Sequence, residues 1–220
     1  MKEHSHMTIS LSARNCATVA AIVIAATSVG AGAARSSATT PAALGNAGAA
    51  GSAQAVFAGG CFWCTEADFD KVPGVISTTS GYTGGRAANP TYEQVSAGGT
   101  GHIEAVRVVF DPKRVSYAAL VRRFLPTIDV TDGGGQFCDR GESYRPALFV
   151  GNPQERQHAI VALKRIDPRI AKPLAVAVLP AGRFWPAEGY HQDYYKKNPT
   201  KYKFYRWKCG RDARLKEVWG

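Results

Sequence analysis

The feature that most constrains the fold of this chain is a short apolar segment that ends in two glycines and leads directly into a cysteine. Residues 55–58 are apolar and predict a strand, which stops at Gly59 and Gly60. Residues 61–71 then carry apolar side chains at roughly helical spacing, with acidic side chains between them, and predict a helix that begins at Cys61. A strand, a glycine turn and a helix in direct succession are typical of α/β chains.

The chain continues with predicted strands and helices and shows no internal repeat. The first helix ends before Pro73, because proline disfavours the helical conformation of the residue before it. Ser116 is suited to cap the next helix. The predicted strands cover residues 75–82, 102–110, 147–150 and 175–179, the helices cover 117–125 and 153–166, and a short segment covers 92–95. These elements predict an α/β (α+β) two-layer sandwich, with helices packed on a mixed sheet and long ordered loops. We expect a monomer.

The first fifty residues differ in composition from the rest of the chain. Lys2 and Arg14 flank a polar start, residues 17–29 are apolar and uncharged, and small residues follow at positions 31–33. This order is the layout of a secretory signal peptide. The apolar run is shorter than the roughly 20 residues that a membrane span needs.

The sequence therefore predicts a signal peptide at residues 1–33, a flexible tether at 34–53 and a folded catalytic domain at 54–220. We expect an exported, periplasmic protein without a stable membrane anchor after cleavage. The alternative is an uncleaved signal that anchors the chain in a membrane.

The chain is basic, with 27 Lys and Arg against 17 Asp and Glu. Such a balance suits nucleic acid or an anionic membrane surface. Residues 193–220 combine basic and aromatic side chains, as grooves for single-stranded nucleic acid do, but no nucleic-acid motif accompanies them. We expect a packed, solvated terminal segment and no nucleic-acid partner. The hydrophobic fraction of 45% excludes a disordered chain.

The chain has five cysteines, too few for a fold that depends on disulfides. They are Cys16, Cys61, Cys64, Cys138 and Cys209. Cys61 lies at the predicted start of a helix, where the helix dipole lowers the pKa of a thiol and favours the nucleophilic thiolate. A zinc site would need a second closely spaced pair, but Cys138 and Cys209 are isolated. A structural disulfide between Cys61 and Cys64, or a thioredoxin-like dithiol exchanger, are further alternatives. We expect no metal and no cofactor.

Several motifs occur together and in one order along the chain. They are GGCFWCTE at residues 59–66, GYTGG at 81–85, NPTY at 89–92, GHIEAV at 101–106, GQFCDRG at 135–141, SYR at 143–145, HQDYY at 191–195 and KNP at 197–199. In these motifs the sequence resembles the peptide methionine sulfoxide reductases of the A type. The resemblance runs from about Ala55 to the C-terminus.

The resemblance implies reduction of the S epimer of methionine sulfoxide, free or in proteins, with thioredoxin or a similar dithiol as the reductant. Cys61 would attack the sulfoxide sulfur, and Phe62 and Trp63 would hold the substrate methyl group in an apolar pocket. Attack leaves the cysteine as a sulfenic acid, which condenses with a nearby thiol to a disulfide.

Four polar residues receive roles from the same resemblance. Glu104 would protonate the sulfoxide oxygen, which is a poor leaving group without a proton. Tyr82 and Tyr144 would hydrogen-bond that oxygen, and Asp139 would orient the site. A dithiol exchanger would not need Glu104 and the tyrosines to converge on the cysteine, so their positions discriminate between the two functions. His102 and His191 are predicted to be structural, with His191 a candidate to line the site.

Three cysteines are candidates to resolve the sulfenic acid. Cys209 comes first, because it lies in a charged, glycine-containing tail and family members often use a C-terminal cysteine. Cys64 is held near Cys61, and Cys138 lies beside Asp139, so both are alternatives. The segment from Pro199 to Cys209 is longer than the glycine-rich tail of some relatives.

Overall fold

A computed structural model of the chain describes residues 51–166, 168, 170 and 172–220. The predicted signal peptide, Cys16 and the tether up to residue 50 lie outside the described residues. The folded part begins with a strand at Ala53, the last residue that the sequence assigned to the tether.

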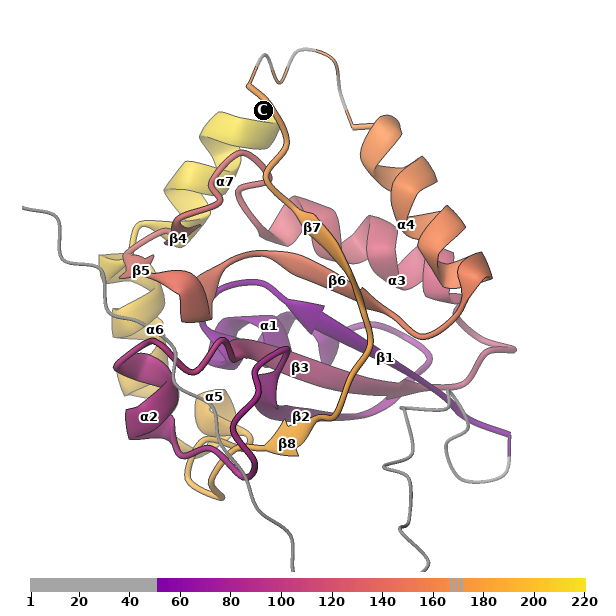
Figure 1. Cartoon of the computed structure of the whole chain (residues 1–220). Helices are drawn as coiled ribbons and strands as arrows, with labels where there is room; N and C mark the ends of the chain where they lie inside the picture. Colours follow the sequence, from indigo (N-terminus) through magenta and orange to yellow (C-terminus); the bar gives the residue numbers. More distant parts are fainter. Residues whose placement is uncertain (1–50, 167, 169, 171) are drawn as a thin grey trace, which may run out of the picture. The chain divides into compact units, whose positions relative to one another are not determined.

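A mixed sheet forms the centre of the described part (Figure 1). Its strand order is β7-β6-β1-β3-β2-β8, and neighbouring strands are antiparallel except β6 and β7, which are parallel. The strands are β1 (Ala53–Ala58), β2 (Val75–Thr83), β3 (Ile103–Phe110), β6 (Ala147–Val150), β7 (Ala177–Pro180) and β8 (Trp185–Pro186). The short strands β4 (Gly135–Gln136) and β5 (Asp139–Arg140) form a separate hairpin. The predicted mixed sheet is confirmed.

Seven α-helices accompany the sheet in the described part of the chain. They are α1 (Phe62–Phe69), α2 (Tyr92–Ser96), α3 (Tyr117–Phe124), α4 (Pro153–Lys164), α5 (Tyr194–Lys197), α6 (Pro199–Lys208) and α7 (Arg211–Trp219), with 3₁₀ turns η1 (Leu125–Thr127) and η2 (Glu142–Tyr144). The Ser116 hydroxyl accepts a hydrogen bond from the Ala119 N–H, so the predicted cap of α3 is confirmed. Helix α1 ends at Phe69, two residues earlier than predicted.

Helices α1 and α3 and the sheet enclose the larger hydrophobic core. The rings of Phe57 and Phe69 have centroids 4.6 Å apart, and those of Phe57 and Phe124 are 5.2 Å apart. Leu120 and Val121 from α3 are fully buried against this cluster. Burial of such large apolar side chains holds the β1–α1 turn against the sheet.

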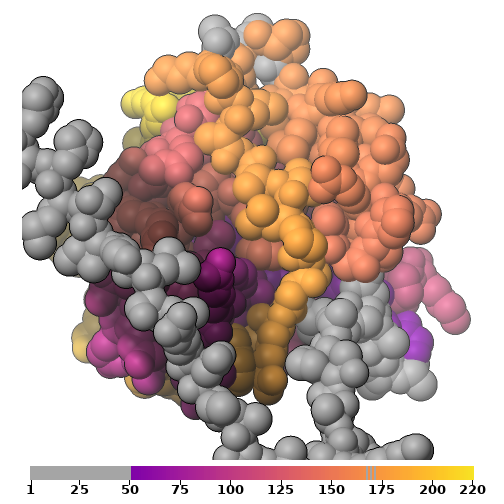
Figure 2. Space-filling view, in the orientation of Figure 1, coloured from indigo at the N-terminus to yellow at the C-terminus, as the bar shows by residue number. Residues whose placement is uncertain are grey.

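The opposite face of the sheet carries a second, smaller core. Ile103 and Ala105 of β3 pack there with Phe149 and with Phe184, which lies between β7 and β8. The segment from β7 to β8 crosses this face as a continuous band between α4 and α2 (Figure 2). Residues 103–106 are therefore buried on both faces. The band covers the side of β3 that faces away from the larger core.

The C-terminal helices α6 and α7 follow one another beside the β4–β5 hairpin (Figure 1). The sequence analysis had not resolved these helices within the basic and aromatic segment at residues 193–220. None of the helices in the described ranges has the length and apolarity needed to cross a membrane.

Candidate active site

Cys61 lies at the turn between β1 and α1 and is the N-cap residue of the helix. Gly60 precedes it with a φ of +78°, and a Cβ atom at that position would lie 2.5 Å from the side chain of Gln136. Only glycine fits this turn without strain. The turn leaves the Phe62 N–H, the first of α1, free to donate to a side chain beside the cysteine, and Cys61 itself is only 6% exposed.

The two free thiols of the described part, Cys61 and Cys64, form a hydrogen-bonded pair. Burial, followed by this hydrogen bond, raises the pKa of Cys61 well above its ordinary value. The same bond lowers the pKa of Cys64 to about 7, with a further contribution from the positive charge of Arg211. The sequence had predicted a lowered pKa for Cys61 from the helix dipole. That expectation is wrong, because burial raises the pKa.

Glu104 reaches the site from β3. Its carboxyl oxygen accepts a hydrogen bond from the Phe62 N–H at 3.0 Å, so it lies at the first turn of α1. The side chain is only 3% exposed, and burial raises its pKa to about 8 although the Phe62 N–H opposes this shift. Glu104 therefore carries a proton at neutral pH and is chemically an acid.

Two tyrosines adjoin Glu104. Tyr82 of β2 is its cross-strand partner in the sheet register, and its hydroxyl donates to Glu188 at 2.9 Å. Tyr144 follows the hairpin, and its hydroxyl donates to the hydroxyl of Tyr92. Burial raises the pKa of both tyrosines, and the hydrogen bond to Glu188 is the next cause for Tyr82. Both hydroxyls therefore stay protonated and can act as hydrogen-bond donors.

Asp139 approaches Cys61 through a residue that the sequence analysis missed. Tyr205 of α6 donates its hydroxyl hydrogen bond to the Asp139 carboxylate, and the same hydroxyl is hydrogen-bonded with the Cys61 thiol. Burial raises the pKa of Asp139. The neighbouring Arg140 forms its ion pair with Asp132 and not with Asp139.

Phe62 and Trp63 form an aromatic wall beside the cysteine. Phe62 is 1% exposed and packs on the ring of His191 with a centroid distance of 4.9 Å. The Trp63 indole stacks on Tyr194 at 3.7 Å, and its N–H donates to Nδ1 of His191 at 3.0 Å. Burial lowers the pKa of His191, so its neutral ring accepts this bond. His191 thus lines the wall and orients Trp63.

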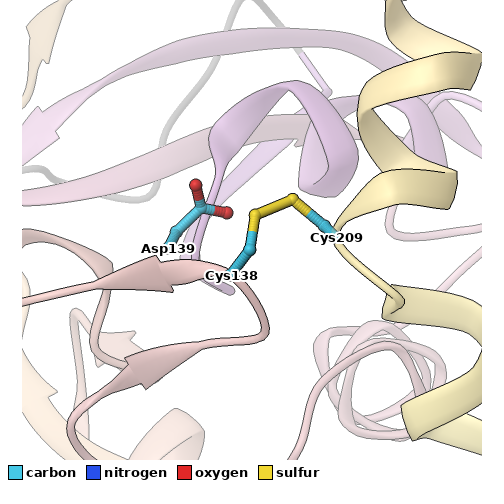
Figure 3. Close-up of side chains that lie close together, drawn as sticks. All are labelled: Cys138, Asp139 and Cys209. Atoms are coloured by element: carbon cyan, nitrogen blue, oxygen red, sulfur yellow. A yellow bond between two sulfur atoms is a disulfide. The ribbon is translucent and has the colours of Figure 1, made fainter.

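The remaining cysteines of the described part are joined to each other. Cys138, at the tip of the β4–β5 hairpin, and Cys209, at the end of α6, form a disulfide (Figure 3). Cys138 is the exposed member of the pair. Asp139 adjoins both, because its carboxylate and the two sulfur atoms all lie within 4.8 Å of one another. The same three residues are the one grouping of metal-ligand type among the described residues, but sulfur atoms joined in a disulfide are not thiolate ligands.

Arg211 connects the disulfide region with the catalytic turn. This buried side chain donates to the carbonyl oxygens of Gly59 and Thr127 at 3.3 Å and 2.7 Å, and its guanidinium lies over the ring of Phe137 at 4.5 Å. Phe137 has a φ of 56°, an uncommon conformation for a bulky residue. Arg211 and Tyr205 were missed because their basic and aromatic neighbours suggested a solvated surface. Arg211 lies two residues after Cys209 and Tyr205 lies four residues before it, and this closeness to a candidate redox cysteine was the signal that could have identified them.

Comparison with known proteins gives a consistent result. The family model described as peptide methionine sulfoxide reductase matches residues 53–220. A relative named peptide methionine sulfoxide reductase MsrA 2, from Rhizobium meliloti, is 51% identical over 166 residues. The match covers 76% of this chain and 83% of that relative. A relative named MsrA/MsrB, from Vibrio cholerae, is 52% identical over 76% of this chain, but the chain spans only 45% of that relative's length.

Solved structures agree with the sequence comparison. Methionine sulfoxide reductase A of Corynebacterium diphtheriae matches with a TM-score of 0.66 and 34% identity, over 69% of this chain and 77% of that one. Reduced Mxr1 from Saccharomyces cerevisiae matches with a TM-score of 0.66 and 27% identity, over 70% of this chain and 89% of that one.

Proposed function

The chain belongs to the peptide methionine sulfoxide reductase family, an oxidoreductase family, and we propose that it reduces the S epimer of methionine sulfoxide with Cys61 as the nucleophile. The observation that carries this proposal is the convergence of a thiol, a protonated carboxyl and two tyrosine hydroxyls at the start of α1. A dithiol exchanger would not need a carboxyl and two tyrosine hydroxyls to converge on the cysteine.

Glu104 is the acid of the proposed reaction. The Cys61 sulfur attacks the sulfoxide sulfur while Glu104 protonates the oxygen. The hydroxyl passes to the Cys61 sulfur as the sulfur–oxygen bond breaks and the sulfide leaves, and the thiol proton of Cys61 returns to Glu104. A carboxyl with a pKa of about 8 holds that proton at neutral pH. Tyr82 and Tyr144 donate hydrogen bonds to the oxygen as it gains charge. Tyr82 must leave Glu188 to do so, whereas Tyr144 must turn from Tyr92.

The aromatic wall selects the substrate group that faces Cys61. Phe62 and Trp63 offer an apolar surface for the methyl group, and His191 holds the indole in place by its hydrogen bond. The Tyr205 hydroxyl links Asp139 to the cysteine and fixes the sulfur relative to this wall.

Cys64 is the cysteine that we assign to the first resolving step, in place of Cys209. After the sulfide product leaves, Cys61 is a sulfenic acid, and attack by the Cys64 thiolate forms a disulfide while the leaving hydroxyl takes up the proton that Cys64 gave up and departs as water. Cys64 is favoured because it is hydrogen-bonded to Cys61 and has a pKa of about 7. Cys209 is bonded to Cys138.

Cys138 and Cys209 then serve as the surface dithiol. In their reduced form they would reduce the Cys61–Cys64 disulfide by two thiol exchanges and become the disulfide seen in the structure. A thioredoxin-like protein reductant would attack the exposed sulfur of Cys138, release the Cys209 thiolate and leave with its own two cysteines oxidised.

The activity is tested with separate S and R epimers of a methionine sulfoxide peptide and dithiothreitol. Loss of the S epimer alone is expected, together with no loss of either epimer by the Cys61→Ser variant. Reduction of neither epimer by the unsubstituted chain would remove the proposal and favour the dithiol exchanger.

Export to the periplasm is part of the proposal and rests on the layout of residues 1–33. The exported domain would act as a monomer with a thioredoxin-like partner in the same compartment. N-terminal sequencing of the protein recovered from the periplasm tests the cleavage, which is expected close to residue 33. An intact N-terminus on membrane-bound protein would contradict it.

A further inference from the structure

Helix α6 has an inner face and an outer face. Tyr202 is buried in the interior, Tyr205 reaches the catalytic site, and Arg206 bonds to Asp68. On the outer face, Phe204 is 58% exposed and Trp207 is 75% exposed, the largest exposure among the large hydrophobic side chains of the described part. Contiguous exposed apolar surface is a feature of interaction sites.

The two aromatic rings form one patch. Their centroids are 5.9 Å apart, as expected for side chains three residues apart on a helix. At about 3.6 residues per turn, Lys203 projects on one side of this pair and Lys201 and Lys208 project on the other. We call these five residues the aromatic–lysine face.

The charge of this face is not neutralised. The described residues form no ion pair with any of its three lysines, whereas two other cations of the C-terminal segment are paired. Arg206 binds Asp68 and Asp212, and Lys196 binds Asp70 and Asp193. Asp212 shares a shallow hollow with Trp207 and Lys203, but its charge is engaged by Arg206. An anionic partner is therefore the complement of this face.

We propose that the aromatic–lysine face docks the protein reversibly on an anionic lipid bilayer. Tryptophan is suited to the headgroup region because its ring is apolar and its indole N–H is polar. Lysines beside it keep their charges among anionic headgroups while their stems cover apolar surface. A helix with aromatic residues in the centre and lysines on both sides has the composition of an interfacial helix.

Two other partners fit the face less well. Interfaces between proteins are depleted of lysine, and this face has three lysines around two aromatic rings. Single-stranded nucleic acid is bound in basic grooves, whereas this surface is the convex outside of a helix. Docking through the outer face also leaves the opposite side of α6, which carries Tyr205, directed at the catalytic site.

The test is sedimentation of the full chain with vesicles of phosphatidylcholine alone and of equal phosphatidylcholine and phosphatidylglycerol. We expect stronger binding to the anionic vesicles, which added salt reverses. Each lysine at an anionic surface contributes a factor of about five, so the Lys201→Gln, Lys203→Gln, Lys208→Gln variant should bind roughly 100-fold more weakly. The Phe204→Ser, Trp207→Ser variant should lose roughly tenfold or more.

A matched control changes the same charge elsewhere. Lys113, Lys164 and Lys172 are exposed, and the described residues form no ion pair with them, so their replacement by Gln should leave binding within about fivefold of the unsubstituted chain. All variants share residues 1–50, so their differences report on α6 alone. Reductase activity on a soluble peptide should stay unchanged and shows that each variant is folded.

Three outcomes would overturn the proposal. The first is equal vesicle binding by the aromatic, lysine and control variants. The second is preferential binding of a single-stranded oligonucleotide that depends on Trp207. The third is a self-association, measured by light scattering, that the Trp207 substitution abolishes.

Discussion

The two cysteine pairs of this protein differ in almost every physical respect. Cys61 and Cys64 lie one helical turn apart at the start of α1, are buried and are free. Cys138 and Cys209 are separated by 71 residues in sequence, join a hairpin tip to a helix end and are bonded, and Cys138 is exposed. The comparison fits the proposed roles, in which the buried pair reacts with a small substrate and the Cys138–Cys209 pair meets a protein reductant. Asp139 and Tyr205 lie between them.

The largest effect is expected from removing the acid beside the buried pair. Glu104→Gln keeps the shape of the side chain but supplies no proton, so kcat/KM should fall by roughly 10² to 10⁴. In the unsubstituted chain, the acid form that catalysis needs is present below pH 8 and is lost as the pH rises through the pKa of about 8. The rate should therefore fall above that pH. The pH profile of single-turnover reduction checks this result.

The Gln variant supplies the control for this profile. Its low rate should show no decline around pH 8, because the titrating group is gone. A decline of equal size in both proteins would assign the pH dependence to another group and would break the proposed role of Glu104.

The Cys138–Cys209 pair, called the exposed pair below after its exposed member Cys138, should be needed for turnover only when the reductant is a protein. Cys209→Ser leaves Cys61 and Cys64 intact, so one sulfoxide per chain should still be reduced. Thioredoxin-driven cycling should fall by roughly 100-fold, whereas dithiothreitol, a small molecule that can enter the buried site, should still support turnover. Steady-state assays with the two reductants measure the difference. Unchanged cycling with thioredoxin would show that the exposed pair carries no electrons.

The exposed pair should also contribute to stability. Its disulfide closes a long loop, and the Cys138→Ser, Cys209→Ser variant should lose about 2–4 kcal/mol in the free energy of unfolding. Urea denaturation of the variant and of the unsubstituted oxidised chain measures this change. The Cys64→Ser variant is the control, because it removes a free thiol and leaves the disulfide in place.

The smallest effect is expected from the residue between the pairs. Tyr205→Phe removes the hydroxyl that links Asp139 to Cys61 and keeps the ring, so kcat should fall about tenfold with little change in KM. Tyr202→Phe is a matched control on the same helix, since its hydroxyl bonds to Arg206 and not to the cysteine. An equal fall in kcat in both variants would mean that the substitutions only destabilise α6 and would contradict the role of the Tyr205 hydroxyl.

The buried pair was largely predictable from the sequence, and the exposed pair was not. The strand, the two glycines and Cys61 are adjacent in sequence, so local rules placed the nucleophile at a helix start. The resemblance to a known family identified Glu104, Tyr82 and Tyr144. Local rules gave the wrong direction for the pKa of Cys61, because burial depends on the whole packed site.

The pairing of Cys138 with Cys209 depends on where a hairpin tip meets a helix end, and no local pattern encodes that meeting. The sequence analysis did not predict the C-terminal helices, because their basic and aromatic composition suggested a solvated segment. Their amphipathic character became clear only when Tyr205 and Arg211 were seen on the inner side. The sequence analysis preferred Cys209 as the residue that resolves Cys61. It contained no pattern from which the bond between Cys209 and Cys138 could be predicted.

One measurement tests most directly whether Cys61 and Cys64 react with the substrate while Cys138 and Cys209 serve only in the later reduction. The chain is prepared with Cys61 and Cys64 reduced and with Cys138 and Cys209 oxidised, and it is given one equivalent of the S sulfoxide without reductant. Peptide mapping after quenching should find a Cys61–Cys64 disulfide, an intact Cys138–Cys209 disulfide and one sulfide product per chain. A bond between Cys61 and Cys209 or Cys138, with Cys64 still free, would contradict the account.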